Sequence, residues 1–182
     1  MTWEEQLFGF LDDLEQQAEG LYAAERDLEH ADRARSEYQQ VSLAARLMAS
    51  LESEVVVHVT GVGAVRGRLD RVGQGWCLVH GAAQEWVVPL RAVAAVEGGS
   101  PRAVPEVAWS PVTRLGLGSA LRRLAEAGER CVLRRLDGGV HDGVLHRVGQ
   151  DFVEVSEGAG AGARLTLVAF AAIAAVQSPD VG

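Results

Sequence analysis

Apolar side chains recur at helical spacing over residues 3 to about 38. Acidic residues border a stripe of leucines placed seven residues apart, Leu7, Leu14, Leu21 and Leu28. This spacing predicts an amphipathic helix. Gly20 weakens a helix interior by roughly 1 kcal/mol relative to alanine, so a helical hairpin is an alternative. Like charges beside the stripe disfavour pairing of two identical parallel helices, so docking on the rest of the chain or on a basic partner is expected more than self-pairing.

From residue 42 onward the pattern changes to short apolar runs, and it occurs twice. Residues 71–74, Arg-Val-Gly-Gln, recur 76 positions later as residues 147–150. Both copies have Gly-x-Leu shortly before this motif, beginning at Gly67 and Gly143, and an apolar run that begins with an aromatic residue shortly after it. A repeat of this length indicates two copies of one small structural unit.

Each copy contains a short amphipathic helix followed by about five short strands. The expected helices are 43–48 and 120–125. The expected strands of copy one lie near 55–57, up to 69, 76–79, 86–90 and 93–96, and those of copy two near 131–133, up to 145, 152–155, 166–170 and 173–176.

The predicted fold class is α+β. An N-terminal amphipathic helical segment is followed by two tandem small five-stranded antiparallel β-barrels, each preceded by a short helix. The expected domains are an acidic helical segment 1–40, a first barrel 41–97, a Pro/Gly linker 98–112 and a second barrel 113–178.

The order of these elements and several motif residues resemble the Sm-like fold, a small SH3-like barrel. In copy two the resemblance rests on residues 137–138 (Asp-Gly), 143–145 (Gly-x-Leu) and 151–153 (Asp-Phe-Val), and copy one follows through its similarity to copy two. It covers roughly 42–96 and 118–176. As a whole, the chain is similar to an uncharacterised high-GC Gram-positive (actinobacterial) family with tandem Sm-like/SH3-like barrels, whose members are loosely labelled Fis-type regulators.

The resemblance implies a fold but not the RNA site of Sm-like proteins. Those proteins typically bind RNA through an aspartate after the second strand, an asparagine in the third strand and an Arg-Gly pair near the end. At the first place this chain has Gly73 and Gly149, and at the second it has Cys77 and Val153. Neither copy has Arg-Gly at the third place. An RNA site of that kind is therefore not expected.

Charge divides the chain into two parts. Residues 1–54 carry 13 acidic residues against 4 arginines, whereas the remainder is close to neutral, and the net charge is −8. No apolar run reaches the roughly 18 residues that a membrane helix needs. The acidic beginning lacks the basic and apolar regions of an export signal. A cytoplasmic location without membrane contact is expected.

Residue clusters that carry catalysis are hard to find in this sequence. Cys77 and Cys131 lie in apolar strand-like runs, where buried reduced thiols are the usual case. The five histidines have neither equivalent places in the two copies nor the spacing of a metal site. The glycine-rich stretches 61–67, 116–119 and 158–162 lack the surroundings of nucleotide-binding or nucleophile motifs. We therefore expect no enzyme activity, cofactor, metal or small-molecule substrate.

Three aromatic residues are candidates for interaction surfaces. Trp76 and Phe152 open the third strand of their copies, and alternation places them opposite the core residues of the same strands. An outward aromatic at the same place in both copies suggests a covered face. The N-terminal helix, the other copy or a partner protein can provide the cover. Trp109 lies in the proline-containing linker, where filling a crevice between domains is expected more than ligand binding.

Arginines of copy two are the candidates for nucleic-acid contact, in particular Arg122, Arg123, Arg134 and Arg135. Binding to phosphates needs clustered positive charge, yet eight arginines face seven carboxylates between residues 113 and 176. Pairing with the acidic N-terminal segment or a solvated face also accounts for these arginines.

These observations predict a non-enzymatic binding or scaffolding protein that acts through protein–protein contacts of the duplicated barrels and the acidic helix. Self-association through paired barrel-edge strands is a further hypothesis. The alternative is a nucleic-acid-associated transcriptional or RNA regulator that uses arginines of copy two.

Overall fold

The structure is a computed structural model that describes residues 16, 19, 22, 33, 35–158 and 162–179. The chain divides into two compact units, Met1–Val41 and Ser42–Gly182. In the first unit, the described residues 16, 19, 22, 33 and 35–38 are helical. The leucine stripe predicted for this unit lies outside the described residues.

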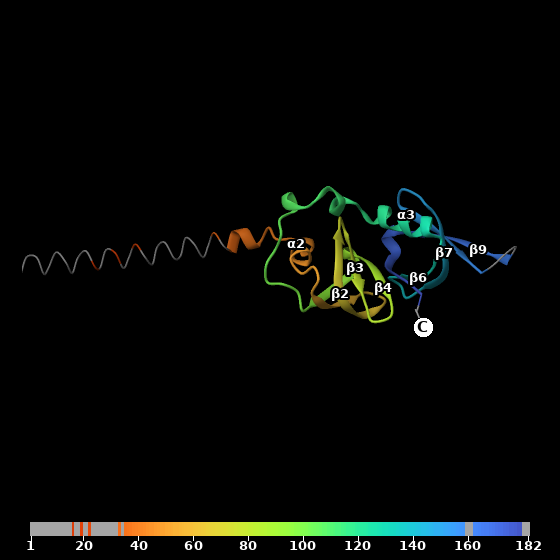
Figure 1. Cartoon of the computed structure of the whole chain (residues 1–182), viewed down its shortest axis with the longest axis horizontal. Helices are drawn as coiled ribbons and strands as arrows, with labels where there is room; N and C mark the ends of the chain where they lie inside the picture. The colour runs from red at the N-terminus through yellow and green to blue at the C-terminus, as the bar shows by residue number, and fades with distance from the viewer. Residues whose placement is uncertain are drawn as a thin grey trace, which may run out of the picture. The chain divides into compact units, whose positions relative to one another are not determined.

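The second unit contains the repeat (Figure 1). Its strands are β1 (Glu54–Val59), β2 (Gly63–Gly73), β3 (Trp76–His80), β4 (Glu85–Pro89), β5 (Val93–Glu97), β6 (Arg130–Arg135), β7 (Val140–Val148), β8 (Phe152–Glu157), β9 (Arg164–Ala169) and β10 (Ile173–Gln177). Its helices are α2 (Leu43–Met48) and α3 (Leu117–Ala127), with short 3-10 turns η1 (Leu90–Ala92), η2 (Glu106–Ala108), η3 (Pro111–Arg114) and η5 (Phe170–Ala172). The first half is α2 to β5 and the second half is α3 to β10. The twin of a residue is the residue at the same place in the other half.

Local sequence explains where these elements begin and end. Ser42 caps α2, because its Oγ accepts a hydrogen bond from Ala45 N at 3.1 Å. α3 ends at Gly128, whose φ of 66° is the left-handed conformation that glycine adopts without steric cost. Every second residue of β1 is buried, as alternation along a half-buried strand requires.

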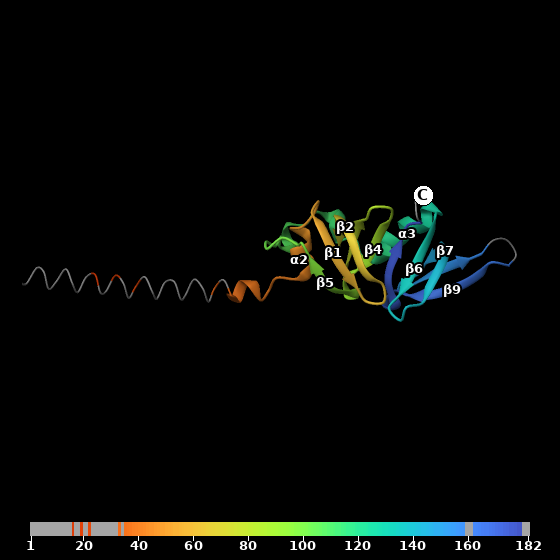
Figure 2. The same cartoon turned by 90° about the horizontal axis from the view of Figure 1, so that it is seen from below.

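The strands form one antiparallel sheet in the order β5-β1-β2-β3-β4-β10-β6-β7-β8-β9. Both halves have the same internal order, with the fifth strand beside the first. The halves meet where β4 pairs with β10, in the register Val176↔Val87 and Gln177↔Trp86. Figure 2 shows the two end strands, β5 and β9, at opposite ends of the second unit.

The predicted fold class with two tandem five-stranded barrels is wrong. Closure of each half would pair β4 with β5 and β9 with β10, and neither pairing occurs in the described part of the chain. β4 instead pairs with β10 of the other half, so the strands continue as one open sheet. The physical reason is burial, because Val87 and Val176 lose nearly all their exposure where these strands meet. The repeat predicts the strands of each copy but leaves open which edges pair.

Each of the two hydrophobic cores takes residues from both halves. The first core includes Leu47 of α2 and Leu69 of β2, and it also contains Ala174 and Ala175 of β10. The second core is built mainly from the second half, and it also contains Val87 of β4. The halves are therefore interlocked.

Gly67 and Gly143 recur in the repeat because a neighbouring strand passes close to both. A Cβ atom added to Gly67 would overlap the carbonyl group of His80, and one added to Gly143 would overlap that of Ser156. The pairing register shifts shortly after each glycine, between β2 and β3 and between β7 and β8. Such bulges bend a strand, so both halves bend at the same point of the repeat.

Candidate protein-binding edges of the sheet

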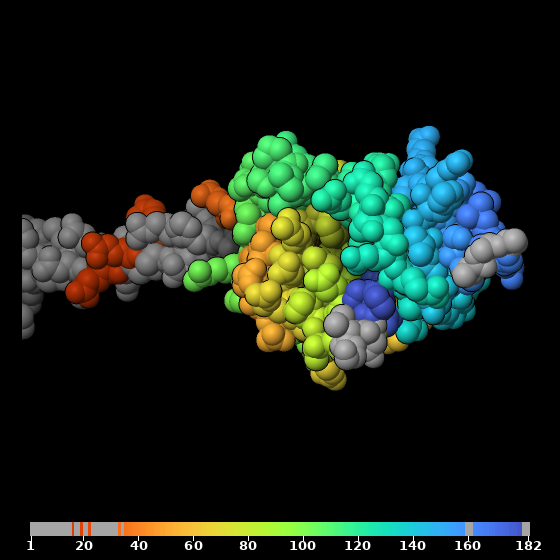
Figure 3. Space-filling view, turned by 45° about the vertical axis from the view of Figure 1, so that its right-hand side comes forward, coloured from red at the N-terminus to blue at the C-terminus, as the bar shows by residue number. Residues whose placement is uncertain are grey.

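The junction between the halves shows how an edge of this sheet is paired. Ser178 N donates to the carbonyl of Glu85, and Glu85 N donates to Ser178 Oγ, both at 2.9 Å. Val87 of β4 is 8% exposed and Val176 of β10 is 2% exposed. Figure 3 shows the end of β10, in dark blue, lying between the yellow-green surface of the first half and the cyan surface of the second. A paired edge in this protein is hydrogen-bonded along its backbone and buried in its side chains.

Side chains of Arg134 and Arg91 also bridge the junction. Arg134 Nε donates to Gln177 Oε1 at 2.8 Å, and its guanidinium lies 5.9 Å from the centroid of the Trp86 ring, within cation–π range. Arg91 Nη2 donates to the carbonyl of Ile173 at 3.3 Å. Desolvation lowers the pKa of Arg91, but an arginine remains charged at neutral pH. These contacts fix β4 and the turn after it to the second half.

β9 is the last strand of the sheet, and no strand pairs with its outer edge within the described residues. Leu165 is 52% exposed and Leu167 is 63% exposed. Leu167 is the twin of Val87: Val87 pairs with Leu78, and Leu167 pairs with Glu154, which lies 76 residues after Leu78. The same strand position is therefore buried in the first half and exposed in the second.

β5 is the first strand of the sheet, and its outer edge also has no partner strand in the part of the chain that the structure describes. Ala94 and Ala95 are exposed on it. Their twins in β10, Ala174 and Ala175, are 0% exposed. The alanines at these two positions are thus exposed on β5 and buried on β10.

The predicted aromatic residues Trp76 and Phe152 lie over glycines of their own motif. A Cβ atom added to Gly73 would overlap the Trp76 ring, and one added to Gly149 would overlap the Phe152 ring. Trp76 packs against the second core and donates from Nε1 to the carbonyl of Leu115 at 2.8 Å. The sequence leaves three candidates for the group that covers Trp76: the N-terminal helix, the other copy and a partner protein. In the structure the other copy covers it, through the second core. Phe152 is half-buried.

Trp109 anchors the linker. It is 8% exposed, and its Nε1 donates to the carbonyl of Val104 at 3.0 Å. Val104 N in turn donates to the carbonyl of Ala45 at 2.9 Å. The indole therefore packs within the linker, which is hydrogen-bonded to α2 of the first half. Its low exposure leaves little surface for a ligand.

The four predicted arginines lie on two elements, two on α3 and two on β6. Arg122 and Arg123 are exposed on α3, and Arg123 forms an ion pair with a glutamate of the same helix at 3.2 Å. Arg134 contributes to the junction between the halves. Arg135 is hydrogen-bonded to Asp137, which lowers the pKa of that carboxyl group and raises the pKa of Arg135. Arg123 and Arg135 are thus each paired with a carboxylate, and Arg134 is hydrogen-bonded to Gln177.

A cavity of about 250 Å³ lies where α3 and β6 face β3 and β4. Its apolar lining includes Trp76, Leu78, Val87 and Leu124. Sequence reasoning does not find this cavity, although one signal is present, because Leu78 has a charged twin, Glu154. A leucine at an outward place whose twin is charged indicates that this face is covered in the first half only.

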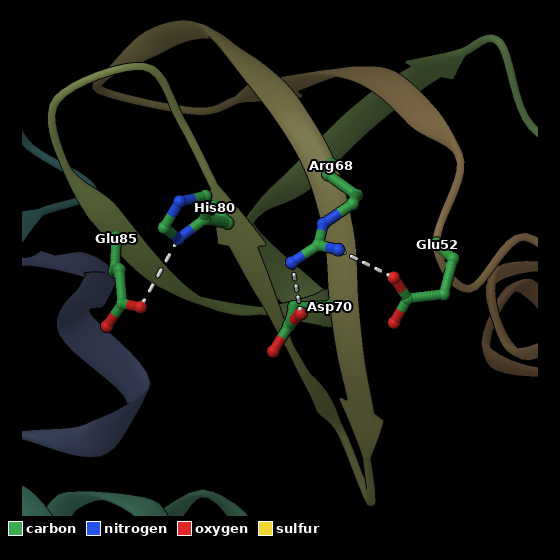
Figure 4. A network of polar contacts seen from close by, with 5 residues as sticks. All are labelled: Glu52, Arg68, Asp70, His80 and Glu85. Atoms are coloured by element: carbon green, nitrogen blue, oxygen red, sulfur yellow. Dashed lines mark hydrogen bonds and ion pairs between the residues drawn. The ribbon is translucent and has the colours of Figure 1, made fainter.

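A network of polar side chains lies on the surface of the first half (Figure 4). Arg68 Nη1 lies 2.8 Å from Glu52 Oε2, and Arg68 Nη2 lies 3.1 Å from Asp70 Oδ1. Nearby, His80 Nδ1 lies 3.3 Å from Glu85 Oε1. Exposed pairs of this kind contribute about 0–1 kcal/mol each.

The described residues offer little for catalysis. Among them, no group of three or more His, Cys, Asp or Glu side chains could hold a metal ion. Cys77 and Cys131 are buried and unbonded, as their apolar strands predict. Burial raises the pKa of Cys77 to about 12 and that of Cys131 to about 11. Both thiols are protonated and poorly nucleophilic at neutral pH.

Comparisons with known protein families and curated proteins found no match for this chain. No protein-family model matches the sequence, and no curated protein is significantly similar to it. None of the helices in the described part of the chain is both long and apolar enough to cross a membrane.

Proposed function

We propose that this protein is a non-enzymatic binding protein that acts through protein–protein contacts, with β9 as its docking edge. The observation that carries the proposal is the exposure of Leu165 and Leu167 on a strand whose outer edge has no partner strand among the described residues. An exposed edge offers backbone N–H and C=O groups to a further strand, and apolar side chains on it are buried when that strand is added.

The composition of β9 supports this proposal. Natural proteins protect edge strands with charged side chains, proline or short length. After Arg164 the strand has the sequence Leu-Thr-Leu-Val-Ala, with neither charge nor proline. Its twin β4 contains Pro89, which is buried in the paired edge. Arg164 at its start is the one charged residue of β9, and the apolar remainder of the strand favours burial by a partner.

Capture from extracts of the native host tests the docking edge. Tagged wild-type chain is compared with Leu167→Arg, which places a charge on the outer edge strand. The matched control is Val140→Arg, because Val140 of β7 is 51% exposed and its strand pairs with β6 and β8. We expect wild type and the control to capture the same protein and Leu167→Arg to lose most of it. Equal capture by all three would refute β9 as the docking edge.

The alternative, a nucleic-acid-associated regulator, is supported by the exposure of Arg122 and Arg123 on α3. It predicts affinity for nucleic acid that falls as salt rises, and weaker binding by Arg122→Ala/Arg123→Ala at low salt. A flat titration of wild type at low salt would exclude it.

A further inference from the structure

The repeat relates the free edges of the sheet to the paired ones. Within one chain, the fourth strand of the first half, β4, pairs with the fifth strand of the second half, β10. The remaining fifth strand, β5, and the remaining fourth strand, β9, stand first and last in the sheet order. Among the described residues, one chain thus has one free edge of each kind.

β5 closely matches β10, the strand that β4 already binds. Their sequences are Val-Ala-Ala-Val-Glu and Ile-Ala-Ala-Val-Gln. Each follows a three-residue 3-10 turn and pairs with the first strand of its half. A neighbouring side-chain contact is repeated too: His58 Nε2 lies 2.7 Å from Glu97 Oε1, and Arg134 Nε lies 2.8 Å from Gln177 Oε1 at the twin position.

Exposure distinguishes the free edges from the paired ones. Leu167 of β9 is 63% exposed, whereas its twin Val87 is 8% exposed. Ala95 of β5 is exposed, whereas its twin Ala175 is fully buried. The strand positions that are buried at the internal junction are therefore exposed at both ends of the sheet.

One chain cannot join its own two free edges, because β5 and β9 lie at opposite ends of the second unit (Figure 2). A second copy of the chain carries the complementary edge at each end. Each contact between two copies therefore pairs one β9 edge with one β5 edge without any new type of pairing.

We propose that β9 of one chain pairs with β5 of a second copy, in the register that β4 and β10 use within the chain. This inference rests on the proposed function, because it names the partner of the same edge. In that register Leu167 lies opposite Val96, and Thr166 lies opposite Glu97. The contact joins two different surfaces, so it builds a closed ring or a continuous row of chains.

The mass of the purified full chain, measured by light scattering, tests this assembly. Leu167→Arg blocks the β9 edge, Ala95→Arg blocks the β5 edge, and Val140→Arg is the control on an internal strand. We expect wild type and the control to have masses of several chains that rise with concentration. Each blocked variant alone should be a monomer, with a circular dichroism spectrum like that of wild type.

An equimolar mixture of the two blocked variants is the decisive sample. Each keeps the edge that the other lacks, so the mixture should form a pair with twice the monomer mass. A monomeric wild type, a blocked variant that still assembles alone, or a monomeric mixture would overturn the proposal. If a variant fails to fold, amide hydrogen exchange of wild type replaces it. Protection of both β5 and β9 must then rise with protein concentration, and unchanged exchange overturns the proposal.

Failure of the assembly can be separated from failure of the docking edge. A monomeric wild type, together with a host protein that Val140→Arg captures and Leu167→Arg loses, would leave β9 as a docking edge for a different partner. A monomeric wild type whose captures do not depend on Leu167 would refute both proposals.

Discussion

Four glycines of the repeat lie where a side chain would not fit. Gly67 and Gly143 lie against the backbone of a neighbouring strand, and Gly73 and Gly149 lie beneath an aromatic ring. A substitution at these glycines must displace backbone or a large ring. Their recurrence therefore records close packing and gives no information about catalysis.

Replacement of Gly67 or Gly143 by alanine should lower the free energy of unfolding by about 1–3 kcal/mol, because the added methyl group overpacks a strand pair. Urea unfolding measures this change. Gly162→Ala is the control, since a Cβ atom there meets nothing within 4 Å, and its effect should stay within about 0.5 kcal/mol. Equal stability of Gly67→Ala and Gly162→Ala would contradict the close approach to His80.

The buried thiols determine a response to alkaline pH. The pKa values of about 12 for Cys77 and about 11 for Cys131 in the folded chain lie above the ordinary thiol value of about 8.5. As the pH rises above that value, thiols of the unfolded chain ionise first, so the free energy of unfolding should fall. The fall should be smaller in Cys77→Ala.

Labelling provides a second measurement on the same thiols. At pH 8 a thiolate-selective reagent should modify the unfolded chain and leave the folded chain unmodified. Rapid labelling of the folded protein would show that the two cysteines are accessible.

At the level of elements, alternation and turn residues predict ten strands in the second unit, and each observed strand overlaps its expected range. β2 and β7 continue past their expected ends at Leu69 and Leu145, to Gly73 and Val148. Sequence neighbours such as β1 and β2 pair through short turns, which local residues specify. The pairing of Val87 with Val176 depends on the shapes of both halves, so no local pattern specifies it. Alternation places Leu165 and Leu167 of β9 on the face opposite the buried Val168, but it does not show whether another element covers that face.

The helix α3 contributes two buried side chains to the second core, Leu117 and Leu121. Leu121 is 0% exposed and lies in the second core. Leu121→Ala should lower the free energy of unfolding by about 2–5 kcal/mol, measured by urea unfolding. Leu43→Ala is the control on α2, because Leu43 is 44% exposed. An equal effect of the two substitutions would show that α3 does not seal the second core.

At the level of the whole second unit, the shared cores couple the two halves. Ala174 and Ala175 of β10 belong to the first core, and Val87 of β4 belongs to the second. We therefore expect a single unfolding transition, with tryptophan fluorescence and far-ultraviolet circular dichroism changing together in urea. Two separate transitions would show that the halves fold independently, as two tandem barrels would.

Arg134→Ala should weaken the junction between the halves. It leaves Gln177, which is 6% exposed, without its hydrogen-bond partner and removes the contact with Trp86. An unsatisfied buried polar group costs about 1–3 kcal/mol. Arg123→Ala is the control, because the Arg123 side chain is 85% exposed, and thermal or urea unfolding compares the two. A loss of stability no greater than that of the control would show that Arg134 does not stabilise the junction.

The linker between the halves makes the contact of β4 with β10 intramolecular. A tether keeps the local concentration of the two strands high however dilute the protein is. The proposed contacts between chains through β5 and β9 would have no such tether and would obey mass action. One polypeptide would thus have a permanent strand contact within the chain and a concentration-dependent contact between chains. The number of molecules that a cell makes would set how often the second contact forms.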